Sequence, residues 1–379
     1  RQGRRRPGGL GSNVALALAP GTPGATGALL LVQASPSRGP QRFIFREGIA
    51  LNLWRVVVIG AGSIGTRHVR CFLQTGRTEV AVCEPREERL AELARDYSLS
   101  GLYQSLDEVP LGDFDCAVIC VPAHLHVPVA MKLLEAGLHL LIEKPLCLAM
   151  EQAEEVVIAC ATSDRITGVA YTYRSMPFMQ DLRDAVLRGE IGKVHSVVGV
   201  SGQHFPLYRP DYREIYYKSH ETGGGALQDA MTHVLNYVQW FVGLEESIYC
   251  AGEHLVLPGV EVEDTVTLVC RYPGRVLATL CLNQFQWNND GLIEVAGETG
   301  TLRYQAAAQT LSLYKDEQWS SRQYHCERDE FYVSQANNFL DAVEGKAEVR
   351  CSVAEGAETV RSLVAARQSW KEGREVKVR

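Results

Sequence analysis

A short apolar run that ends in three spaced glycines constrains the fold of this chain more than any other feature. Residues 56–59 read Val-Val-Val-Ile and lead directly into Gly60-x-Gly62-x-x-Gly65, after which residues 66–74 suit a helix. In such a strand–turn–helix unit the first glycine permits the tight turn and the second lets backbone N–H groups approach a pyrophosphate. The third lets the helix lie close to the strand. The pattern therefore predicts a dinucleotide-binding unit.

An acidic residue follows the glycines at the distance that this unit requires. A second apolar strand, residues 79–83, ends in Glu84. It lies about 20 residues beyond the glycines, where a carboxylate accepts hydrogen bonds from an adenosine ribose. Glu84 would repel a 2′-phosphate, although Arg86 would offset part of that repulsion. We therefore expect NAD as the cofactor, with NADP disfavoured.

Strands and helices alternate through the first part of the chain and then give way to consecutive strands. The alternation between residues 53 and 171 predicts a doubly wound parallel sheet of the Rossmann type. Strand-like runs between residues 248 and 314, joined by turn signals, predict an open and mainly antiparallel sheet. The sequence thus predicts an α/β protein with an NAD(P)-binding Rossmann domain at 51–173. An α+β domain for substrate binding and oligomerisation is expected at 174–379.

The first residues differ in kind from the rest of the chain. Residues 1–46 contain no Asp or Glu and are rich in Gly, Pro, Ala and Arg. We expect residues 1–50 to be a disordered tail or a translation artefact. A targeting peptide is the alternative, and the prolines disfavour it because they break an amphipathic helix.

Charge and cysteine usage exclude several classes of protein. The net charge is −7 and no basic stripe is interleaved with aromatic residues, so no nucleic-acid partner is expected. No apolar run approaches the ~18 residues that a membrane span needs. The 11 cysteines are scattered without a Cys-x-x-Cys pair, which favours reduced thiols in the cytoplasm. His124-x-His126 has no apparent third ligand, so no metal is expected.

Two groups of residues carry potential chemistry. Glu143-Lys144-Pro145 follows the predicted strand 139–142, at the sheet edge where open α/β sheets place their ligands. Asp229 and His233 are four residues apart on a predicted helix, so they share one face. A histidine beside a carboxylate suits a general base. Taken singly, the spacing of these residues favours an exposed Glu-Lys pair and an ordinary helix pair over a catalytic role.

The chain from residue 53 onward resembles the Gfo/Idh/MocA family, which includes glucose–fructose oxidoreductase and inositol dehydrogenase. The ordered set of matching residues is Gly60/Gly62/Gly65, Val121-Pro122 with His126, Glu143-Lys144-Pro145, Arg174-x-x-Pro177, Glu190-Ile-Gly192-Lys193, and Gly224-Gly225 with Asp229-x-x-x-His233. The resemblance implies that a final helix, 353–373, packs back near the Rossmann domain. Ala123 stands where many members have Asn, which puts one polar contact near the nicotinamide ribose in doubt.

The resemblance, together with the glycine turn and Glu84, also gives the expected site residues. The expected cofactor contacts are Gly60, Gly62, Ser63, Ile64, Gly65, Glu84, Arg86, Val121, Pro122, His126, Glu143 and Lys144. The catalytic residues carried over from the family are Lys144, Asp229 and His233. The expected reaction is reversible oxidation of a secondary hydroxyl, in which His233 takes the proton, Asp229 orients and charges the imidazole, and Lys144 stabilises the alkoxide.

A loop rich in aromatic, Arg and His side chains, residues 203–218, is expected to shape the substrate pocket. Rings stack on sugars, and an Arg suits a carboxylate or phosphate substituent. The candidate substrate contacts are Tyr173, Arg174, His204, Tyr208 and Arg213, beside Lys144, Asp229 and His233. An irregular loop at a subunit contact is the alternative reading of this segment.

Three functions of different class remain open at this stage. The first is an NAD(P)-dependent dehydrogenase that acts on a CH–OH group of a sugar, polyol or sugar derivative. The second is a glycosidase that uses NAD for transient oxidation, and the third is a non-catalytic NAD-binding sensor. An open sheet has to be covered, so a homodimer or homotetramer is expected.

Overall fold

The computed structural model describes residues 43–46 and 49–379. Most of the expected tail, residues 1–42, therefore lies outside the described residues. Strands β1 (Phe43–Arg46) and β2 (Ile49–Asn52) pair antiparallel with each other. No helix in the described ranges is both long and apolar enough to cross a membrane.

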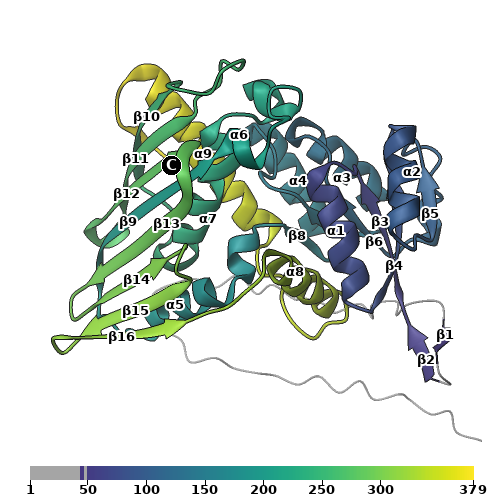
Figure 1. Cartoon of the computed structure of the whole chain (residues 1–379), viewed down its shortest axis with the longest axis horizontal. Coiled ribbons are helices and arrows are strands. Elements are labelled where there is room, and N and C mark those ends of the chain that lie inside the picture. The colour runs from purple at the N-terminus through teal and green to yellow at the C-terminus, as the bar shows by residue number, and fades with distance from the viewer. Residues whose placement is uncertain (1–42, 47–48) are drawn as a thin grey trace, which may run out of the picture. The chain divides into compact units, whose positions relative to one another are not determined.

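The first large sheet is parallel throughout and has the strand order expected of a dinucleotide-binding fold. Its neighbours run β5, β4, β3, β6, β7, β8, which is the order 3-2-1-4-5-6 within this sheet, and Figure 1 shows β5 at the outer edge beside α2. The strands are β3 (Trp54–Ile59), β4 (Thr78–Cys83), β5 (Gly101–Tyr103), β6 (Cys116–Ile119), β7 (His139–Ile142) and β8 (Thr167–Val169). The helices that connect them are α1 (Ser63–Gln74), α2 (Glu87–Asp96), α3 (His126–Glu135) and α4 (Met150–Thr162). The Rossmann prediction is confirmed.

The reason for this arrangement lies in the apolar strands. The side chains of residues 56–58 and 116–119 are fully buried, because helices cover both faces of a parallel sheet. The reversal of strand order between β3 and β6 opens a crevice at their carboxyl ends. The glycine turn leaves β3 at that crevice.

The second large sheet is antiparallel except for the parallel pair β12 and β9. Its order is β16, β15, β14, β13, β9, β12, β11, β10, β17. The strands are β9 (Val194–His204), β10 (Ser247–Glu253), β11 (Thr265–Tyr272), β12 (Val276–Asn283), β13 (Phe285–Gly297), β14 (Thr301–Gln305), β15 (Thr310–Lys315), β16 (Gln318–Gln323) and β17 (Val376–Lys377). The predicted open, mainly antiparallel sheet is therefore confirmed.

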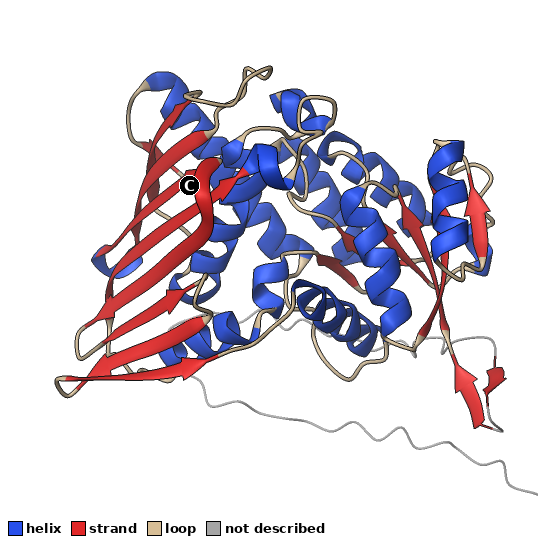
Figure 2. Cartoon of the chain, viewed as in Figure 1, coloured by secondary structure: helices blue, strands red, loops and turns tan. Residues whose placement is uncertain are grey.

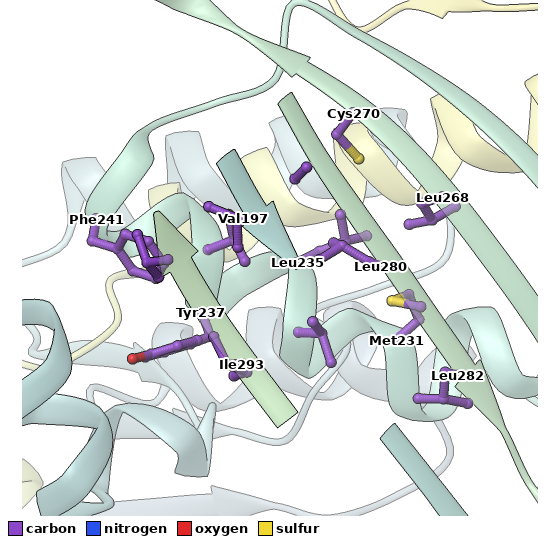
Figure 3. Close-up of a cluster of buried hydrophobic side chains, with 14 of the residues drawn as sticks. Val197, Met231, Leu235, Tyr237, Phe241, Leu268, Cys270, Leu280, Leu282 and Ile293 are labelled. Atoms are coloured by element: carbon purple, nitrogen blue, oxygen red, sulfur yellow. The ribbon is translucent and has the colours of Figure 1, made fainter. Parts of the chain in front are cut away.

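Helices gather on one face of this sheet, as Figure 2 shows. They are α5 (Pro177–Leu187), α7 (Thr232–Val242) and α9 (Val353–Glu372). Alternate side chains of the strands point to this face and pack with α7, so that Leu235 lies among Val197, Leu280 and Ile293 (Figure 3). The intervening residues of the same strands are exposed, among them Val198, Val200, Val269 and Leu277. This alternation is typical of a sheet covered on one side.

Two C-terminal helices pack against the Rossmann part of the molecule. Helix α8 (Arg328–Val343) follows β16 in sequence, yet Phe339 and Leu340 share a core with Val69 and Phe72 of α1. Helix α9 contacts α4 and β8 as well as α7 and β10. Short helices complete the structure: η1 (Leu111–Asp113), η2 (Ala123–Leu125), η3 (Thr172–Ser175), α6 (Phe205–Tyr208), η4 (Tyr216–Lys218), η5 (His220–Thr222), the π-helical η6 (Leu227–Met231) and η7 (Pro273–Arg275).

Candidate active site

One large cavity joins the carboxyl ends of the parallel strands to the helical side of the second sheet. Its volume is about 1340 Å³. Residues after β3, β4, β6 and β7 form one end, and residues of η3, η6, α7 and the segment 199–216 form the other. We call these the α1 end and the η6 end. A cavity of this size accommodates a dinucleotide and a small substrate together.

The α1 end has the shape of a pyrophosphate cradle. Gly60 has a φ of +89°, and a Cβ at Gly65 would lie 1.9 Å from the carbonyl oxygen of Gly60. Gly62 lines the cavity, and a Cβ there would meet no atom within 4 Å. The first turn of α1 holds no acidic residue, and its N-cap has no side-chain hydrogen bond. The N–H groups of this turn are therefore available to phosphate oxygens, so these residues fit the predicted NAD.

Glu84 lies at the end of β4 with its carboxylate facing the same cavity. It accepts hydrogen bonds from the backbone N–H of Ala61 at 2.8 Å and from Nε of Arg86 at 2.6 Å. Burial raises the pKa of Glu84, but these two partners outweigh it and hold the pKa below its ordinary value. An ionised carboxylate has about four acceptor positions, so Glu84 can still accept from a ribose diol.

At the η6 end, Lys144 reaches across from the loop after β7 and contacts Asp229 of η6. Nζ of Lys144 donates to Oδ1 of Asp229 at 3.0 Å and to its backbone carbonyl at 2.6 Å. The hydroxyl of Tyr216 donates to the same Oδ1 at 2.7 Å. Burial raises the pKa of Asp229, but the nearby charges of Lys144 and Arg209 outweigh burial and lower the pKa to about 2. Asp229 is therefore an ionised anchor for Lys144.

His233 lines the same cavity but does not pair with Asp229 as expected. Its ring stacks on Tyr173 at 4.9 Å between centroids and meets Tyr171 edge-on at 5.9 Å. Nδ1 of His233 is buried and has no hydrogen-bond partner among the described residues. Burial and then the charge of Lys144 lower the pKa of His233 to about 3, although Asp229 acts in the opposite direction. The imidazole is therefore neutral at physiological pH.

The expectation that Asp229 orients and charges the imidazole is thus wrong. Lys144 and Tyr216 donate to Oδ1 of Asp229 instead. The local backbone contributes to this difference, because residues 227–231 form a π-helical turn rather than the regular α-helix that the i,i+4 argument assumed.

A buried pair, His68 and Glu143, fixes the backbone of Lys144, and we call this pair the latch. The sequence did not reveal it. Nε2 of His68 on α1 lies 2.7 Å from Oε1 of Glu143, and Oε2 of Glu143 accepts the backbone N–H of Lys144 at 3.1 Å. Burial raises the pKa of Glu143, but His68 outweighs it, so that the pKa lies below its ordinary value. His68 follows Gly65 by three residues on the apolar side of α1. A polar residue on that face was the available signal.

His126 lines the cavity, and the backbone holds its ring in place. Its Nδ1 lies 2.9 Å from the carbonyl of Pro145, and its Nε2 lies 2.9 Å from the carbonyl of Val121. Both ring nitrogens therefore face backbone carbonyls, and because His126 itself lines the cavity, its contact with the cofactor stays a prediction. His126 fixes the loop after β6 to the loop after β7. Val121, Pro122 and Ala123 line the cavity beside it.

Only one of the five candidate residues from the aromatic and basic segments lines the cavity, namely Tyr173. Arg174 is 1% exposed and donates instead to Asn236 at 2.8 Å and to Glu355 at 2.5 Å. His204 packs on Trp287, Tyr208 is about half exposed, and Arg213 donates to the carbonyl of Pro258. These four are corrected as substrate contacts. Other residues of the same segment do line the cavity, namely Gln203, Arg209, Asp211, Ile215 and Tyr216.

The site contains no metal-binding cluster within the described part of the chain. No group of three or more His, Cys, Asp or Glu is placed there to hold a metal ion.

Comparison with known proteins identifies the family of this chain. The family model described as "Oxidoreductase family, NAD-binding Rossmann fold" (Gfo/Idh/MocA) matches residues 54–171, and the "GFO/IDH/MocA C-terminal domain" matches residues 179–303. Myo-inositol 2-dehydrogenase of Thermotoga maritima is 24% identical over 86% of this chain and 98% of that protein. Inositol 2-dehydrogenase of Corynebacterium glutamicum is 30% identical over 50% of this chain and 54% of that protein.

The fold is also similar to solved structures. Levoglucosan dehydrogenase in complex with NADH and levoglucosan superposes with a TM-score of 0.80 at 20% identity, over 86% of this chain and 99% of that one. The matches confirm the predicted family, fold, cofactor and enzyme class, a nicotinamide-dependent dehydrogenase. The chain belongs to the Gfo/Idh/MocA family of oxidoreductases and carries its NAD-binding Rossmann fold.

Proposed function

We propose that this protein reversibly oxidises a secondary hydroxyl of a sugar, polyol or sugar derivative with NAD. The observation that carries the proposal is that Lys144, which follows β7, and His233 of helix α7 line one cavity although they are distant in sequence. The names of relatives such as myo-inositol 2-dehydrogenase and D-glucoside 3-dehydrogenase support a sugar or polyol as the substrate.

The α1 end would hold the cofactor. Backbone N–H groups at Gly62 and the first turn of α1 suit the pyrophosphate, and Glu84 suits the adenosine ribose. Bound NAD accepts a hydride from the substrate carbon or returns one to it. The ionised Glu84 would repel a 2′-phosphate, which favours NAD over NADP.

His233 is proposed as the group that takes the hydroxyl proton. Its ring is neutral because its pKa is lowered to about 3, so one ring nitrogen keeps a lone pair for the transfer of the hydroxyl proton. Nδ1 is buried, which leaves Nε2 as the nitrogen available to a substrate. Stacking on Tyr173 fixes the plane of the ring. General-base assistance of this kind typically contributes ~10²–10⁴ in rate.

Lys144 is proposed to stabilise the oxygen that becomes negative as the proton leaves. The ammonium has three N–H donors, and its two hydrogen bonds to Asp229 leave one for the substrate oxygen. Asp229 acts through Lys144 by holding it in place, with Tyr216 fixing the carboxylate in turn. A fixed cation at a developing oxyanion contributes on the order of 10²–10³ in rate.

The remaining parts of the function are also proposals. Exposed apolar residues on the helix-free face of the second sheet support a homo-oligomer formed through that face. The 11 cysteines are all free thiols, which supports a reducing, cytoplasmic location.

The test is a substrate panel with the purified protein. Polyols, aldoses, sugar acids and sugar phosphates are incubated with NAD or NADP, and the absorbance of the reduced cofactor is followed. We expect NAD reduction by at least one compound, with NAD preferred. Cleavage of a glycoside without net NADH would instead indicate the glycosidase, and NAD binding without any reaction would indicate a sensor.

A further inference from the structure

The cationic side chains of the cavity divide into two groups. Five of them are ion-paired with carboxylates of the protein: Arg67, Arg70, Arg86, Arg89 and Lys144. The other two, Arg209 and Arg328, have no ion pair with any residue in the ranges that the structure describes. Arg328 is exposed, whereas Arg209 is partly buried. Arg209 is therefore the cation that most requires explanation.

Arg209 belongs to the η6 end of the cavity. Among neighbouring groups, Asp229 raises the pKa of Arg209 most, followed by Tyr216, Tyr332 and Asp211. Burial lowers the pKa of Arg209, but these groups outweigh it and hold the pKa above its ordinary value. The guanidinium is therefore charged, and it lies near the residues proposed to act on the substrate rather than at the glycine turn.

The backbone that carries Arg209 is held firmly. It ends the short helix α6, and its own N–H donates to the carbonyl of Phe205 at 2.7 Å. Phe205 is buried in a small separate core with Tyr212, Tyr217, Leu257, Val260 and Val262. The guanidinium carbon lies 5.8 Å from the Phe205 ring centroid. A guanidinium carried by a backbone held in this way presents its donors with little loss of side-chain freedom.

The charge balance at this end favours an anion. Lys144 and Tyr216 both donate to Oδ1 of Asp229, and this carboxylate forms no ion pair with Arg209 in the described ranges. No hydrogen bond joins the Arg209 side chain to an acceptor in the described part of the chain. A partly desolvated guanidinium without an acceptor is unfavourable, and its planar donor pair matches carboxylate and phosphate oxygens.

We propose that Arg209 recognises an anionic substituent of the substrate, a carboxylate or a phosphate, and so makes a sugar acid or sugar phosphate the preferred substrate. This inference rests on the proposed function, whose substrate class it narrows. Arg209 would set specificity by binding, while Lys144 and His233 act at the reacting hydroxyl.

The test compares matched substrates in matched variants. Several aldohexoses, their uronic acids and their 6-phosphates are assayed with NAD in the wild type, Arg209→Gln, Arg209→Lys and Arg213→Gln. Arg213 is the control because it lies in the same segment but donates to the carbonyl of Pro258 outside the cavity. Thermal unfolding of each variant shows that it is folded.

We expect kcat/KM of the wild type to be about ten- to a hundredfold higher for a charged sugar than for the parent hexose. Arg209→Gln should remove most of this preference through KM, Arg209→Lys should keep part of it, and Arg213→Gln should keep all of it. The uronic acid and phosphate arms show which anion is bound.

Two results would overturn the inference. One is a wild-type preference for neutral hexoses, and the other is an equal loss for charged and neutral substrates in a folded Arg209→Gln variant. If no compound is oxidised at all, the proposed function fails. Calorimetric titration of the uronic acids and 6-phosphates in the presence of NAD then decides the role of Arg209, since affinity that does not depend on Arg209 contradicts it.

Discussion

The two ends of the cavity present different parts of the chain to their ligands. At the α1 end the donors are backbone N–H groups, and the glycines matter through the space that they leave open. At the η6 end the active groups are side chains from two separate segments, with Lys144 after β7 and Asp229 and His233 on the continuous η6–α7 stretch. The first end therefore depends on local backbone shape, and the second depends on how distant segments pack. Substitutions at the α1 end should therefore affect cofactor binding, and substitutions at the η6 end should affect catalysis.

The largest expected effect is at the η6 end. Lys144→Ala should lower kcat by at least about a hundredfold, because the developing oxyanion loses its cation. The dissociation constant for NAD, measured by fluorescence titration, should change by only a few-fold. Lys132→Ala is the control, since Lys132 forms an exposed ion pair with Asp107 away from the cavity. A Lys144 variant that turns over normally would contradict the proposed role.

The glycine turn offers the converse experiment. A Cβ at Gly65 would lie 1.9 Å from the carbonyl oxygen of Gly60, whereas one at Gly62 would meet nothing within 4 Å. Gly65→Ala should therefore lower the free energy of unfolding by about 1–3 kcal/mol. Gly62→Ala should leave stability near the wild-type value but weaken NAD binding, because the new methyl group enters the cradle. Denaturant unfolding measures the change in stability, and NAD titration measures the change in affinity. Loss of stability but not of NAD affinity in Gly62→Ala, with the opposite result in Gly65→Ala, would refute the cradle.

The decrease in unfolding free energy at acidic pH should depend on His233. The folded protein holds the pKa of His233 at about 3, below the ordinary 6.5, so the unfolded chain takes up the proton first. The stability due to the neutral ring is fully present above pH 6.5 and is lost as the pH falls toward 3. Between pH 7 and 5 this loss is about 2 kcal/mol.

A variant without the titrating ring provides the comparison. In His233→Gln the decrease in unfolding free energy between neutral and mildly acidic pH should be smaller than in the wild type. His325→Gln, which replaces an exposed histidine, should keep the wild-type decrease. Identical pH dependence in all three proteins would show that His233 is not held neutral.

The smallest expected effect belongs to the latch behind Lys144. His68→Ala removes the partner of buried Glu143, so the backbone of Lys144 should become less well fixed and kcat should fall by about tenfold. His68→Gln keeps a donor and should recover part of the loss. A purely structural role would lower stability alone, so kcat of the folded fraction is the deciding measurement.

The contrast between the two ends also explains what the sequence could predict. The glycine turn, the strand before it and Glu84 lie within one short segment, so their spacing alone indicated their positions. The Lys144–Asp229 pair joins residues 85 apart in sequence, and no local pattern reveals which partner a carboxylate chooses. The π-helical turn at residues 227–231 and the latch from His68 also depend on packing.

Similar reasons apply to the elements that were not predicted. Strand β5 has three residues, and all side chains of β16 are exposed, so neither shows the alternation on which strand prediction relies. Arg174 was a plausible pocket residue by composition. Its burial between η3, α7 and α9 follows from the packing of the C-terminal helix, which brings Glu355 against it.

The central claim is that Lys144 and His233 act on one substrate molecule from opposite parts of the chain. A double-mutant cycle tests it most directly, with single-turnover rates of NAD reduction measured for the wild type, Lys144→Ala, His233→Ala and the double variant. Groups that act together in one transition state give strongly non-additive losses. The double variant should therefore be slower than the worse single variant by less than about tenfold. Losses that multiply would contradict the claim.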